Sequence, residues 1–370
     1  MNATNFNPYN FQYQGKSLSI QIKKYILEFN FLARTSRGSM QYKPTYFVKV
    51  QDLANGKIGI GECSPLKGLS LEYRADYEDK LQYFCEKLAD ADFYESILSL
   101  NSIVAFPSIR FGLEMAVKDL IEGGGKIFFE NAFSQGQEPL PINGLVWMGD
   151  YDFMLQQMEE KLAAGFTCIK LKIGGIEFDK ECELLNRLRK DFSPKKITIR
   201  LDANGAFSTE SAMQKLETLS KFDVHSIEQP IKQGQVQEMA ALCKKTPIPI
   251  ALDEELIGIN QINKKMALLD AIQPQYIILK PSLLGGFQAS EEWISLAEER
   301  NIDWWITSAL ESNIGLNAVA QFTANYNVKI PQGLGTGKLY KNNIDSPLEI
   351  NTGEIKINKN KNWQEVPFDD

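Results

Sequence analysis

Five ionisable side chains recur along the middle of this chain, each at the end of a short β-type run. They are Lys172, Asp202, Glu228, Asp253 and Lys280, in the runs CIKLKIGG, TIRLDANG, HSIEQP, PIALDEE and YIILKP. Consecutive members are about 25 to 30 residues apart, roughly the length of one strand, one loop and one helix. The spacing therefore predicts one ionisable group per βα unit of a closed barrel, with all five at the same rim.

The chain is longer than such a barrel requires. An eight-stranded βα barrel uses about 250 residues, whereas this chain has 370. We therefore expect an α/β fold, a (β/α)₇β TIM-type barrel with an α+β capping domain formed by the N-terminal segment and the C-terminal tail. The predicted limits are 1–125 for the capping domain, with 339–370 returning to it, and 126–338 for the barrel that carries the site.

The first 125 residues have their own pattern. Residues 18–62 alternate as a three-stranded antiparallel meander would, with a turn-like segment ARTSRGSM and a second turn at Asn55-Gly56. Amphipathic helices are expected at 71–90 and 107–122. The tract Gly123-Gly124-Gly125 should end the second helix.

From residue 141 strand and helix patterns alternate. Strands are predicted near 141–147, 168–173, 198–202, 225–228, 248–253, 276–280, 304–308 and 331–334. Helices are predicted near 152–164, 178–191, 209–221, 235–245, 260–269, 288–300 and 313–325. The tail from Leu339, with the strand-like EIKIN, Trp363 and Phe368, is too long for an eighth barrel helix alone and should return to the capping domain.

Composition excludes several classes of protein. With 40 basic and 47 acidic residues and no block of like charge, the chain offers no surface for nucleic acid. No signal-peptide pattern and no long apolar run is present, so we expect a cytoplasmic protein that does not enter a membrane. The five scattered cysteines indicate reduced, buried thiols.

The chain has a single histidine, His225. Ser-His-Asp triads, His-rich zinc sites and acid/base pairs built on imidazole are therefore excluded as the catalytic device. His225 lies three residues before Glu228, at odd spacing, and is interpreted as structural. The base of any proton transfer should be a lysine or a carboxylate.

Asp202, Glu228 and Asp253 end three consecutive predicted strands. Three carboxylates close together repel one another and coexist ionised only around a cation. All-oxygen ligation favours Mg²⁺, with Mn²⁺ as an alternative occupant. The competing interpretation is three separate acids that cap helices or pair with surface lysines.

Lysines flank these acids on both sides of the barrel. Lys170 and Lys172 are two apart and face the same side of one strand, and Lys280 stands on the opposite side. An ammonium group near a divalent cation has a lowered pKa and can serve as a base. Such a set suits removal of a proton from the carbon next to a carboxylate, although plain salt bridges to the acids are the alternative.

The motifs K-x-K, L-D-A-N-G, S-I-E-Q-P, A-L-D-E-E and I-L-K-P, in this order, resemble the enolase superfamily, specifically its muconate-lactonizing subgroup. The segments GECSPLKGLS, SALESNIGLNAVAQ and QGLGTG are similar to the o-succinylbenzoate synthase family, the dehydratases of menaquinone biosynthesis. The resemblance implies conversion of 2-succinyl-6-hydroxy-2,4-cyclohexadiene-1-carboxylate to 2-succinylbenzoate and water by a lyase acting on a small carboxylate.

Carried over by position, the resemblance implies a role for each motif residue. Lys172 would abstract the α-proton and return it to the departing hydroxyl, a syn elimination, while Lys280 would stay charged beside the ring. The resemblance further implies that Asp202, Glu228 and Asp253 bind Mg²⁺. The implied substrate-binding and supporting residues are Lys170, Asn204, Glu254, Ser308, Glu311 and Ser312.

Several positions remain open. Phe207 and Glu255 depart from what many relatives carry, which leaves pocket details unspecified. Loops Thr35–Met40 and Ser64–Leu69 are expected to close over the substrate, although both could be ordinary connections. Arg200 lies one layer below Asp202 and should form a buried ion pair.

Two other functions stay in competition with dehydration. A racemase of N-acylamino acids or an epimerase of dipeptides in the same subgroup would use the same two lysines on opposite faces of the substrate. A non-catalytic binding module is less compatible with an intact set of three acids and two lysines.

Overall fold

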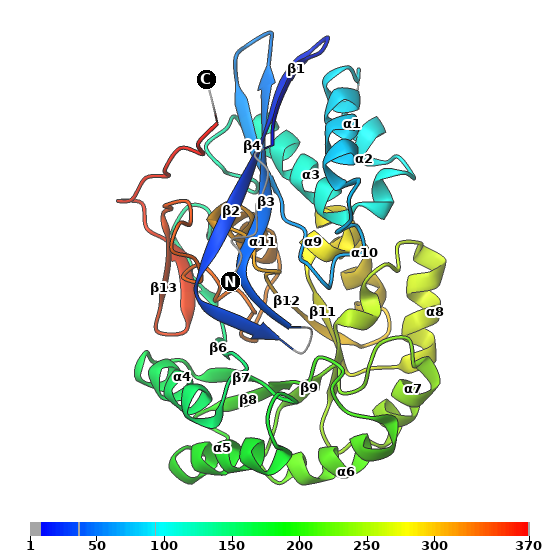
Figure 1. The fold of residues 1–370 in the computed structure, drawn as a ribbon, viewed down its shortest axis with the longest axis vertical. Coiled ribbons are helices and arrows are strands. Elements are labelled where there is room, and N and C mark those ends of the chain that lie inside the picture. Colours follow the sequence, from blue (N-terminus) through cyan, green and yellow to red (C-terminus); the bar gives the residue numbers. More distant parts are fainter. Residues whose placement is uncertain (1–8, 36–37, 93, 369–370) are drawn as a thin grey trace.

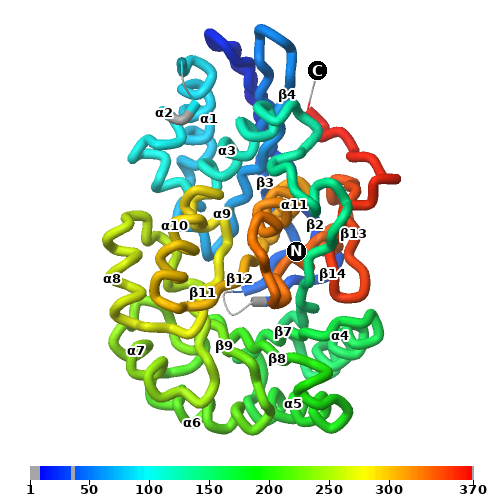
Figure 2. Tube along the Cα trace, turned by 180° about the vertical axis from the view of Figure 1, so that it is seen from behind, coloured from blue at the N-terminus to red at the C-terminus, as the bar shows by residue number. Residues whose placement is uncertain are grey.

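The fold has two layers, a capping part above the mouth of a barrel (Figure 1). The computed structural model describes residues 9–35, 38–92 and 94–368. Figure 2 shows the same chain from behind, with the barrel helices around its lower part. The predicted fold class, a TIM-type barrel with an α+β cap, is confirmed.

The cap begins with a four-stranded antiparallel sheet in the order β1-β2-β3-β4. Its strands are β1 (Asn10–Gln14), β2 (Leu18–Thr35), β3 (Gly38–Asp52) and β4 (Ile58–Cys63). The predicted meander is present, but β1 precedes it as an additional strand. The prediction of a turn over ARTSRGSM is wrong in extent, because Ala33 still pairs with Met40 and Arg34 with Ser39. Ser36 and Arg37 lie outside the described residues.

Helices cover one face of this sheet. They are α1 (Tyr77–Ala89), α2 (Tyr94–Leu98), the short 3₁₀ turn η1 (Ile103–Ala105) and α3 (Pro107–Ile121). The helix expected at 71–90 thus begins at Tyr77, and the helix expected at 107–122 is confirmed. Contact between α3 and β4 requires glycine, because a Cβ on Gly61 would lie 1.9 Å from the carbonyl oxygen of Gly112. All three glycines of the 123–125 tract have positive φ, which ends α3.

The barrel sheet is parallel and has the order β12-β11-β10-β9-β8-β7-β6. Its strands are β6 (Gly144–Val146), β7 (Cys168–Lys172), β8 (Thr198–Asp202), β9 (Ser226–Glu228), β10 (Ile250–Leu252), β11 (Tyr276–Leu279) and β12 (Asp303–Ile306). The eighth strand predicted at 331–334 is not formed. That segment closes the barrel only through isolated bridges, Gln332 to Ile142 and Gly333 to Thr307.

Helices surround the sheet as predicted. They are α4 (Tyr151–Ala163), α5 (Phe178–Asp191), α6 (Thr209–Ser220), α7 (Val236–Lys245), α8 (Ile262–Ile272), α10 (Gly286–Glu298) and α11 (Asn313–Thr323). Two short elements were not predicted, the 3₁₀ turn η2 (Glu254–Leu256) and α9 (Pro281–Leu284), each directly after a strand end. Within the described residues, no helix is long and apolar enough to cross a membrane.

The tail contacts both layers. Strands β13 (Leu348–Asn351) and β14 (Glu354–Ile357) form a small sheet with β5 (Leu140–Pro141), which directly precedes the first barrel strand in the chain. Tyr340 packs on Phe29 of the cap with ring centroids 4.7 Å apart, and Trp363 packs on the cluster that contains Phe47. The tail therefore returns to the capping sheet, as expected. The domain limits 1–125 and 126–338 stay a prediction.

Candidate active site

The five predicted side chains lie at the carboxyl ends of adjacent strands. In the parallel register, Lys172 is opposite Asp202, and Asp202 is opposite Glu228. Asp253 follows β10 directly, and Lys280 follows β11. Because parallel strands end at the same edge, one side chain per strand forms a single cluster at the barrel mouth.

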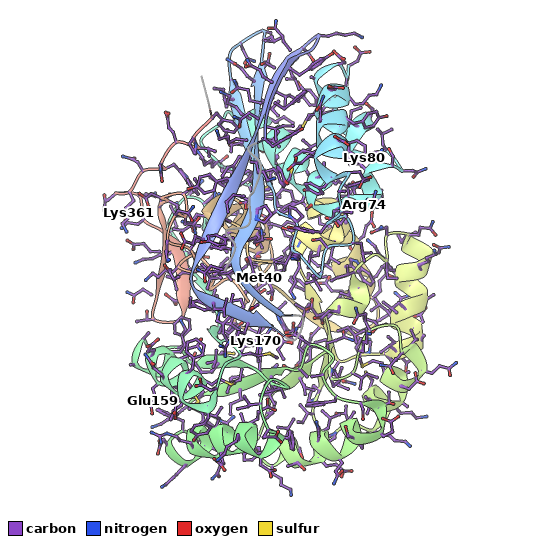
Figure 3. All side chains as sticks on the ribbon, viewed as in Figure 1. Met40, Arg74, Lys80, Glu159, Lys170 and Lys361 are labelled. Atoms are coloured by element: carbon purple, nitrogen blue, oxygen red, sulfur yellow. The ribbon has the colours of Figure 1, made fainter. Side chains whose placement is uncertain are left out.

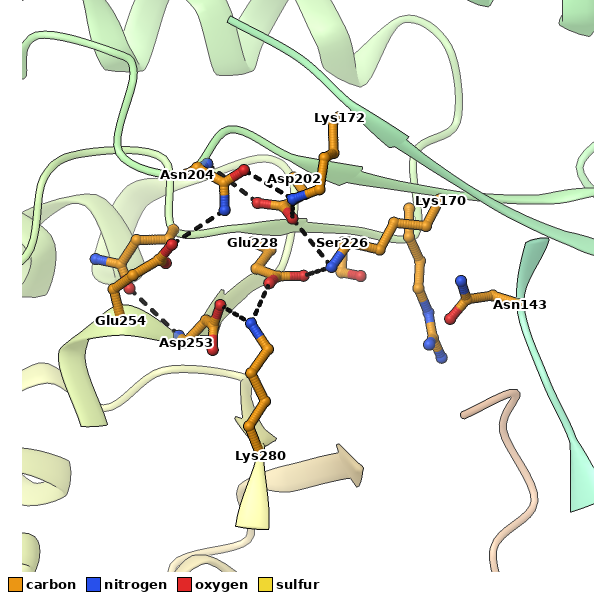
Figure 4. A network of polar contacts seen from close by, with 12 residues as sticks. Asn143, Lys170, Lys172, Asp202, Asn204, Ser226, Glu228, Asp253, Glu254 and Lys280 are labelled. Carbon is orange, nitrogen blue, oxygen red and sulfur yellow. Dashed lines mark hydrogen bonds and ion pairs between the residues drawn. The ribbon is translucent and has the colours of Figure 1, made fainter. Parts of the chain in front are cut away.

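Ion pairs join the cluster into one network (Figure 4). Lys172 Nζ lies 2.8 Å from Asp202 Oδ2, and Lys170 Nζ lies 3.0 Å from the same oxygen. Lys170 also contacts Glu228, and Lys280 contacts Asp253 and lies 3.8 Å from Glu228 Oε1. Figure 4 shows Lys172 and Lys280 reaching the carboxylates from opposite sides. Lys170 and Lys172 share one face of β7, as alternation predicted.

The three carboxylates are buried, with 2% or less of each residue exposed. Burial raises the pKa of Asp202, but the charges of Lys170, Lys172 and Lys280 outweigh it and hold that pKa below its usual range. For Glu228, burial and the flanking Asp202 raise the pKa to about 8. An added positive charge beside Glu228 would therefore be strongly stabilised, because it would oppose both effects.

Burial and the neighbouring carboxylates have opposite effects on the pKa of Lys280. Burial alone would lower it, but the carboxylates of Asp253 and Glu228 raise the pKa above the ordinary lysine value. The same holds for Lys170, whose pKa Asp202 and Glu228 raise against burial. The protein's own charges thus keep these two ammonium groups protonated.

The acidic trio fits a hard divalent cation. Glu228 Oε1 is buried and has no hydrogen-bond partner among the described residues. Across residues 9–35, 38–92 and 94–368, no three His, Cys, Asp or Glu side chains are already arranged around a metal position. In this arrangement Lys170 and Lys280 contact the carboxylates. Carboxylate oxygens are the donors that Mg²⁺ prefers. The ammonium groups that contact these oxygens show that the site favours positive charge. Asp202, Glu228 and Asp253 would hold the ion.

Asn204 and Glu254 support the cluster from one side. Asn204 accepts a hydrogen bond from Lys172 Nζ at 2.9 Å and donates one to Glu254 Oε1 at 3.0 Å. Asn204 takes a positive φ of 43°, which asparagine tolerates better than most residues. Directly after β9, the side chain of Gln229 accepts from the backbone N–H groups of Asp253 and Glu255. These bonds fix the loops that carry the acids.

A cavity opens above the cluster between barrel and cap. It encloses about 800 Å³ counted to its open mouth, a size typical of small-molecule sites. The barrel contributes the polar floor, and the cap contributes Met40, Leu66, Lys67 and Leu69. In Figure 3, Met40 and Lys170 mark this junction of the two layers. Both expected capping loops therefore reach the cavity.

Ser308 lines the cavity, but its hydroxyl group is already used. It donates to Glu311 at 2.5 Å, and it accepts from Thr336 Oγ1 at 2.8 Å and from the Leu310 N–H at 3.1 Å. A hydroxyl group has one donor and two acceptor sites, so all three are occupied. Ser308 therefore shapes the wall and has no free site for a substrate.

Glu311 and Ser312 do not line the cavity, which corrects their prediction as substrate-binding residues. Glu311 is fully buried and accepts from Ser282, Ser308 and the Ala309 N–H. Ser312 donates to Glu62 of the cap at 2.6 Å and caps α11 through the Ile314 N–H. Through Glu62 of β4 and Ser282 of α9, the two residues join the segment after β12 to the cap and to α9.

Two further interpretations have different outcomes. His225 packs on Tyr276 with ring centroids 5.3 Å apart and is not among the cavity-lining residues, consistent with a structural role. Arg200 forms no ion pair among the described residues, so that expectation is wrong. Its guanidinium donates to the Pro331 carbonyl at 2.7 Å and lies 4.2 Å from the Trp305 ring centroid.

Sequence reasoning missed several cavity residues. Asn143, Trp147 and Thr336 line the cavity from segments around β6 and after β12. Lys67 belongs to the loop Ser64–Leu69, which was expected to close over the substrate, but the prediction named no individual side chain of that loop. Lys67, within GECSPLKGLS, and Thr336, within QGLGTG, belong to quoted motifs, whereas Asn143 and Trp147 do not.

Comparison with known proteins agrees with this geometry. Residues 154–361 match the family model described as enolase C-terminal domain-like. The o-succinylbenzoate synthase of Desulfotalea psychrophila is 48% identical over 367 residues, which cover 92% of this chain and 99% of that protein. The chain belongs to the enolase superfamily. Enzymes of this superfamily generally use Mg²⁺.

Solved structures of enolase superfamily members overlay on nearly the whole chain. The crystal structure of MenC from Desulfotalea psychrophila LSv54 has a TM-score of 0.78 and 46% identity, and covers 92% of this chain and 100% of that one. The L-Ala-D/L-Glu epimerase of Bacillus subtilis has a TM-score of 0.81 at 18% identity, covering 92% and 96%. The second likeness shows the fold alone.

Proposed function

We propose that this protein is an o-succinylbenzoate synthase, a lyase that dehydrates 2-succinyl-6-hydroxy-2,4-cyclohexadiene-1-carboxylate to 2-succinylbenzoate. The observation that carries the proposal is the pair Lys172 and Lys280, which face each other from β7 and β11 across three buried carboxylates. The relative that shares 48% of its residues carries the same activity in its name.

Lys172 is the proposed acid and base. In its amine form it removes the proton from the ring carbon that bears the carboxylate. The carbon–oxygen bond of the neighbouring hydroxyl then breaks, the electron pair of the former C–H bond becomes part of the aromatic ring, and the ammonium returns the proton to the hydroxyl as water. Asp202 and Asn204, 2.8 and 2.9 Å from Nζ, hold this side chain on one face of the substrate.

Lys280 is proposed to remain protonated. Asp253 and Glu228 raise its pKa, so its charge persists at neutral pH. From the opposite side of the cavity, this ammonium group can stabilise negative charge that spreads into the ring. Lys170 adds a second fixed positive charge at the floor.

The metal site supports this chemistry. Bound Mg²⁺ would supply a positive charge that stabilises the carboxylate as its α-proton leaves. We propose Asp202, Glu228 and Asp253 as its ligands, and Mn²⁺ as an ion that can replace it. A cytoplasmic location is part of the proposal, since the five cysteines are free, which suits a reducing compartment.

One assay tests the proposal. Purified protein with Mg²⁺ should convert the cyclohexadiene substrate to 2-succinylbenzoate, and the aromatic product is followed by its ultraviolet absorbance. A panel of N-acylamino acids and dipeptides serves as the comparison, because the epimerase likeness makes racemisation the second candidate. Exchange of the α-proton with inversion on that panel, without dehydration, would replace the proposed function.

A further inference from the structure

One charged side chain of the cavity wall takes no part in the network described above. The charged residues that line the cavity are Lys67, Lys170, Lys172, Asp202 and Lys280. The last four belong to the ion-pair network at the floor, which Lys280 joins through Asp253 and Glu228. Within the part of the chain that the structure describes, the ammonium group of Lys67 makes no hydrogen bond or ion pair. Lys67 is thus a free cation on the cap side of an otherwise paired cavity.

The loop that carries Lys67 is held firmly over the barrel. The Leu66 N–H donates to Ser70 Oγ at 2.8 Å, and the Leu69 and Ser70 N–H groups both donate to the Leu66 carbonyl. Leu66 and Leu69 are buried against Leu283 and Ala309. These contacts place the loop above α9 and the end of β12, where Lys280 and Ser308 also lie.

The rest of this wall offers little to an anion. Its other members near the loop are the apolar Met40, Leu66, Leu69, Ala309 and Leu310. The hydroxyl group of Ser308 has all three of its hydrogen-bonding sites occupied, and the neighbouring hydroxyl group of Thr336 donates its proton to Ser308. A second anionic group of a substrate would therefore meet Lys67 as its charged partner, beside apolar surface for the intervening methylene groups.

We propose that Lys67 is a specificity-determining residue that binds the distal carboxylate of a dicarboxylate substrate, the succinyl end, while the ring carboxylate lies at the Lys170–Asp202–Glu228 floor. This inference rests on the proposed function and names the second subsite of the same cavity. A lysine supplies three donors on a flexible stem, which suits a carboxylate at the end of a flexible chain. The interaction pre-positions the ring and discriminates against substrates with an uncharged side chain.

Direct binding separates this role from catalysis. In the presence of Mg²⁺, calorimetry is performed with 2-succinylbenzoate and with 2-butanoylbenzoate, which has a similar chain without the distal carboxylate. Lys67→Gln should weaken binding of 2-succinylbenzoate by about ten-fold, the loss of one charge-assisted hydrogen bond, and should leave the 2-butanoylbenzoate affinity unchanged. Lys67→Arg keeps the charge and should stay within about three-fold of the wild type.

Controls and salt sharpen the test. Lys57→Gln, at an exposed turn of the cap away from the cavity, should match the wild type for both ligands. The preference of the wild type for the dicarboxylate should shrink as salt rises from low to about 0.5 M, since an exposed ion pair is screened, whereas Lys67→Gln should show no such dependence. Equal weakening of both ligands, or none, in Lys67→Gln would overturn the inference.

Turnover by the wild type keeps the two proposals distinguishable. If the wild type dehydrates the cyclohexadiene substrate and Lys67→Gln has an unchanged KM, the inference fails and the proposed function stands. A rise in KM of about ten-fold with kcat nearly unchanged supports both, because the distal contact is made equally in ground and transition states. No turnover by the wild type would overturn the proposed function and the inference together.

Discussion

Lys172 Nζ lies 2.8 Å from Asp202 Oδ2, and the two residues are direct partners in the parallel register of β7 and β8. The proposed proton-transfer group and a carboxylate of the acidic trio are therefore fixed relative to each other by the sheet itself. Neither depends on a mobile loop.

Lys172→Ala should lower kcat by about a thousand-fold, because the group that moves the proton is lost. Mg²⁺ binding, measured by calorimetry, should persist, since the three carboxylates remain. Lys180→Ala, which removes an exposed lysine paired with Glu183 on α5, is the matched control and should retain full activity. Substantial dehydration by Lys172→Ala would contradict the assigned base.

Lys280 should tolerate a change that keeps its charge. Lys280→Met should reduce kcat by about a hundred-fold or more, whereas Lys280→Arg should retain a measurable part of the activity, because a fixed positive charge suffices for stabilisation. Steady-state rates on the cyclohexadiene substrate give the comparison. If Lys280→Arg were as inactive as Lys280→Met, proton transfer by Lys280 would become the better interpretation.

Chelation of divalent ions should abolish turnover, and Mg²⁺ or Mn²⁺ should restore it. Mg²⁺ at about 100 times its Kd should stabilise the wild type by about 2.7 kcal/mol, seen as a rise in Tm. In Asp253→Asn this rise should be much smaller, because one anionic ligand is gone, while the exposed control Asp191→Asn should behave as the wild type. If Mg²⁺ raised the Tm of Asp253→Asn as much as that of the wild type, Asp253 would not be a ligand of the ion.

Glu62→Gln should destabilise the fold by about 2 to 3 kcal/mol. The buried carboxylate accepts from Thr45, from the Ser312 N–H and hydroxyl groups and from the Gly315 N–H, and an amide can accept on only one of its two terminal atoms. Urea denaturation measures the change. Glu183→Gln, at an exposed surface pair, should cost less than about 0.5 kcal/mol; equal effects would deny Glu62 its role in joining cap to barrel.

His225 should titrate well below an ordinary histidine. Burial and then the nearby charge of Arg200 lower its pKa from 6.5 to about 4. The folded protein thus holds fewer protons than the unfolded chain between these values, so stability should fall as pH falls through this window and level off below it. Because the chain has one histidine, its imidazole proton signal in NMR reports the pKa directly.

The lowered pKa of His225 should also be detectable as a change in stability with pH. Between pH 6.5 and about 4, the wild type should lose about 1 kcal/mol more than His225→Phe, which keeps the contact with Tyr276 but cannot titrate. This amount allows for the partial exposure of the imidazole. A measured pKa at or above 6.5 would show that His225 is solvated in the folded protein.

The sequence predicted the barrel and its polar rim because both follow from local pattern. Strand alternation and helix periodicity placed α5 at 178–191 and put a charged residue at each of five strand ends. The predicted strand at 331–334 is not formed, because this segment pairs with distant parts of the chain only through two isolated bridges, Gln332 to Ile142 and Gly333 to Thr307. Strand β1 was missed because the register with β2, not its own composition, defines it.

Some residues could not be assigned without their neighbours in space. Glu311 and Ser312 stand in a motif at a strand end, so sequence reasoning placed them in the pocket. Only the fold brings Glu62 to Ser312 across 250 residues and Ser282 to Glu311. Likewise, Arg200 donates to the Pro331 carbonyl and packs on the Trp305 ring, whereas an ion pair with an acid was expected.

The sequence by itself therefore determined the chemistry of the floor, since the order and spacing of Lys172, Asp202, Glu228, Asp253 and Lys280 are properties of a parallel barrel. The tertiary structure decided which side chains surround a substrate. Loop 64–70 reaches the mouth because Leu66 and Leu69 bury themselves against Leu283 and Ala309, contacts that span more than two hundred residues. Such long-range packing leaves no periodic signal in the sequence, and it leaves Lys67 as a free charge above the site.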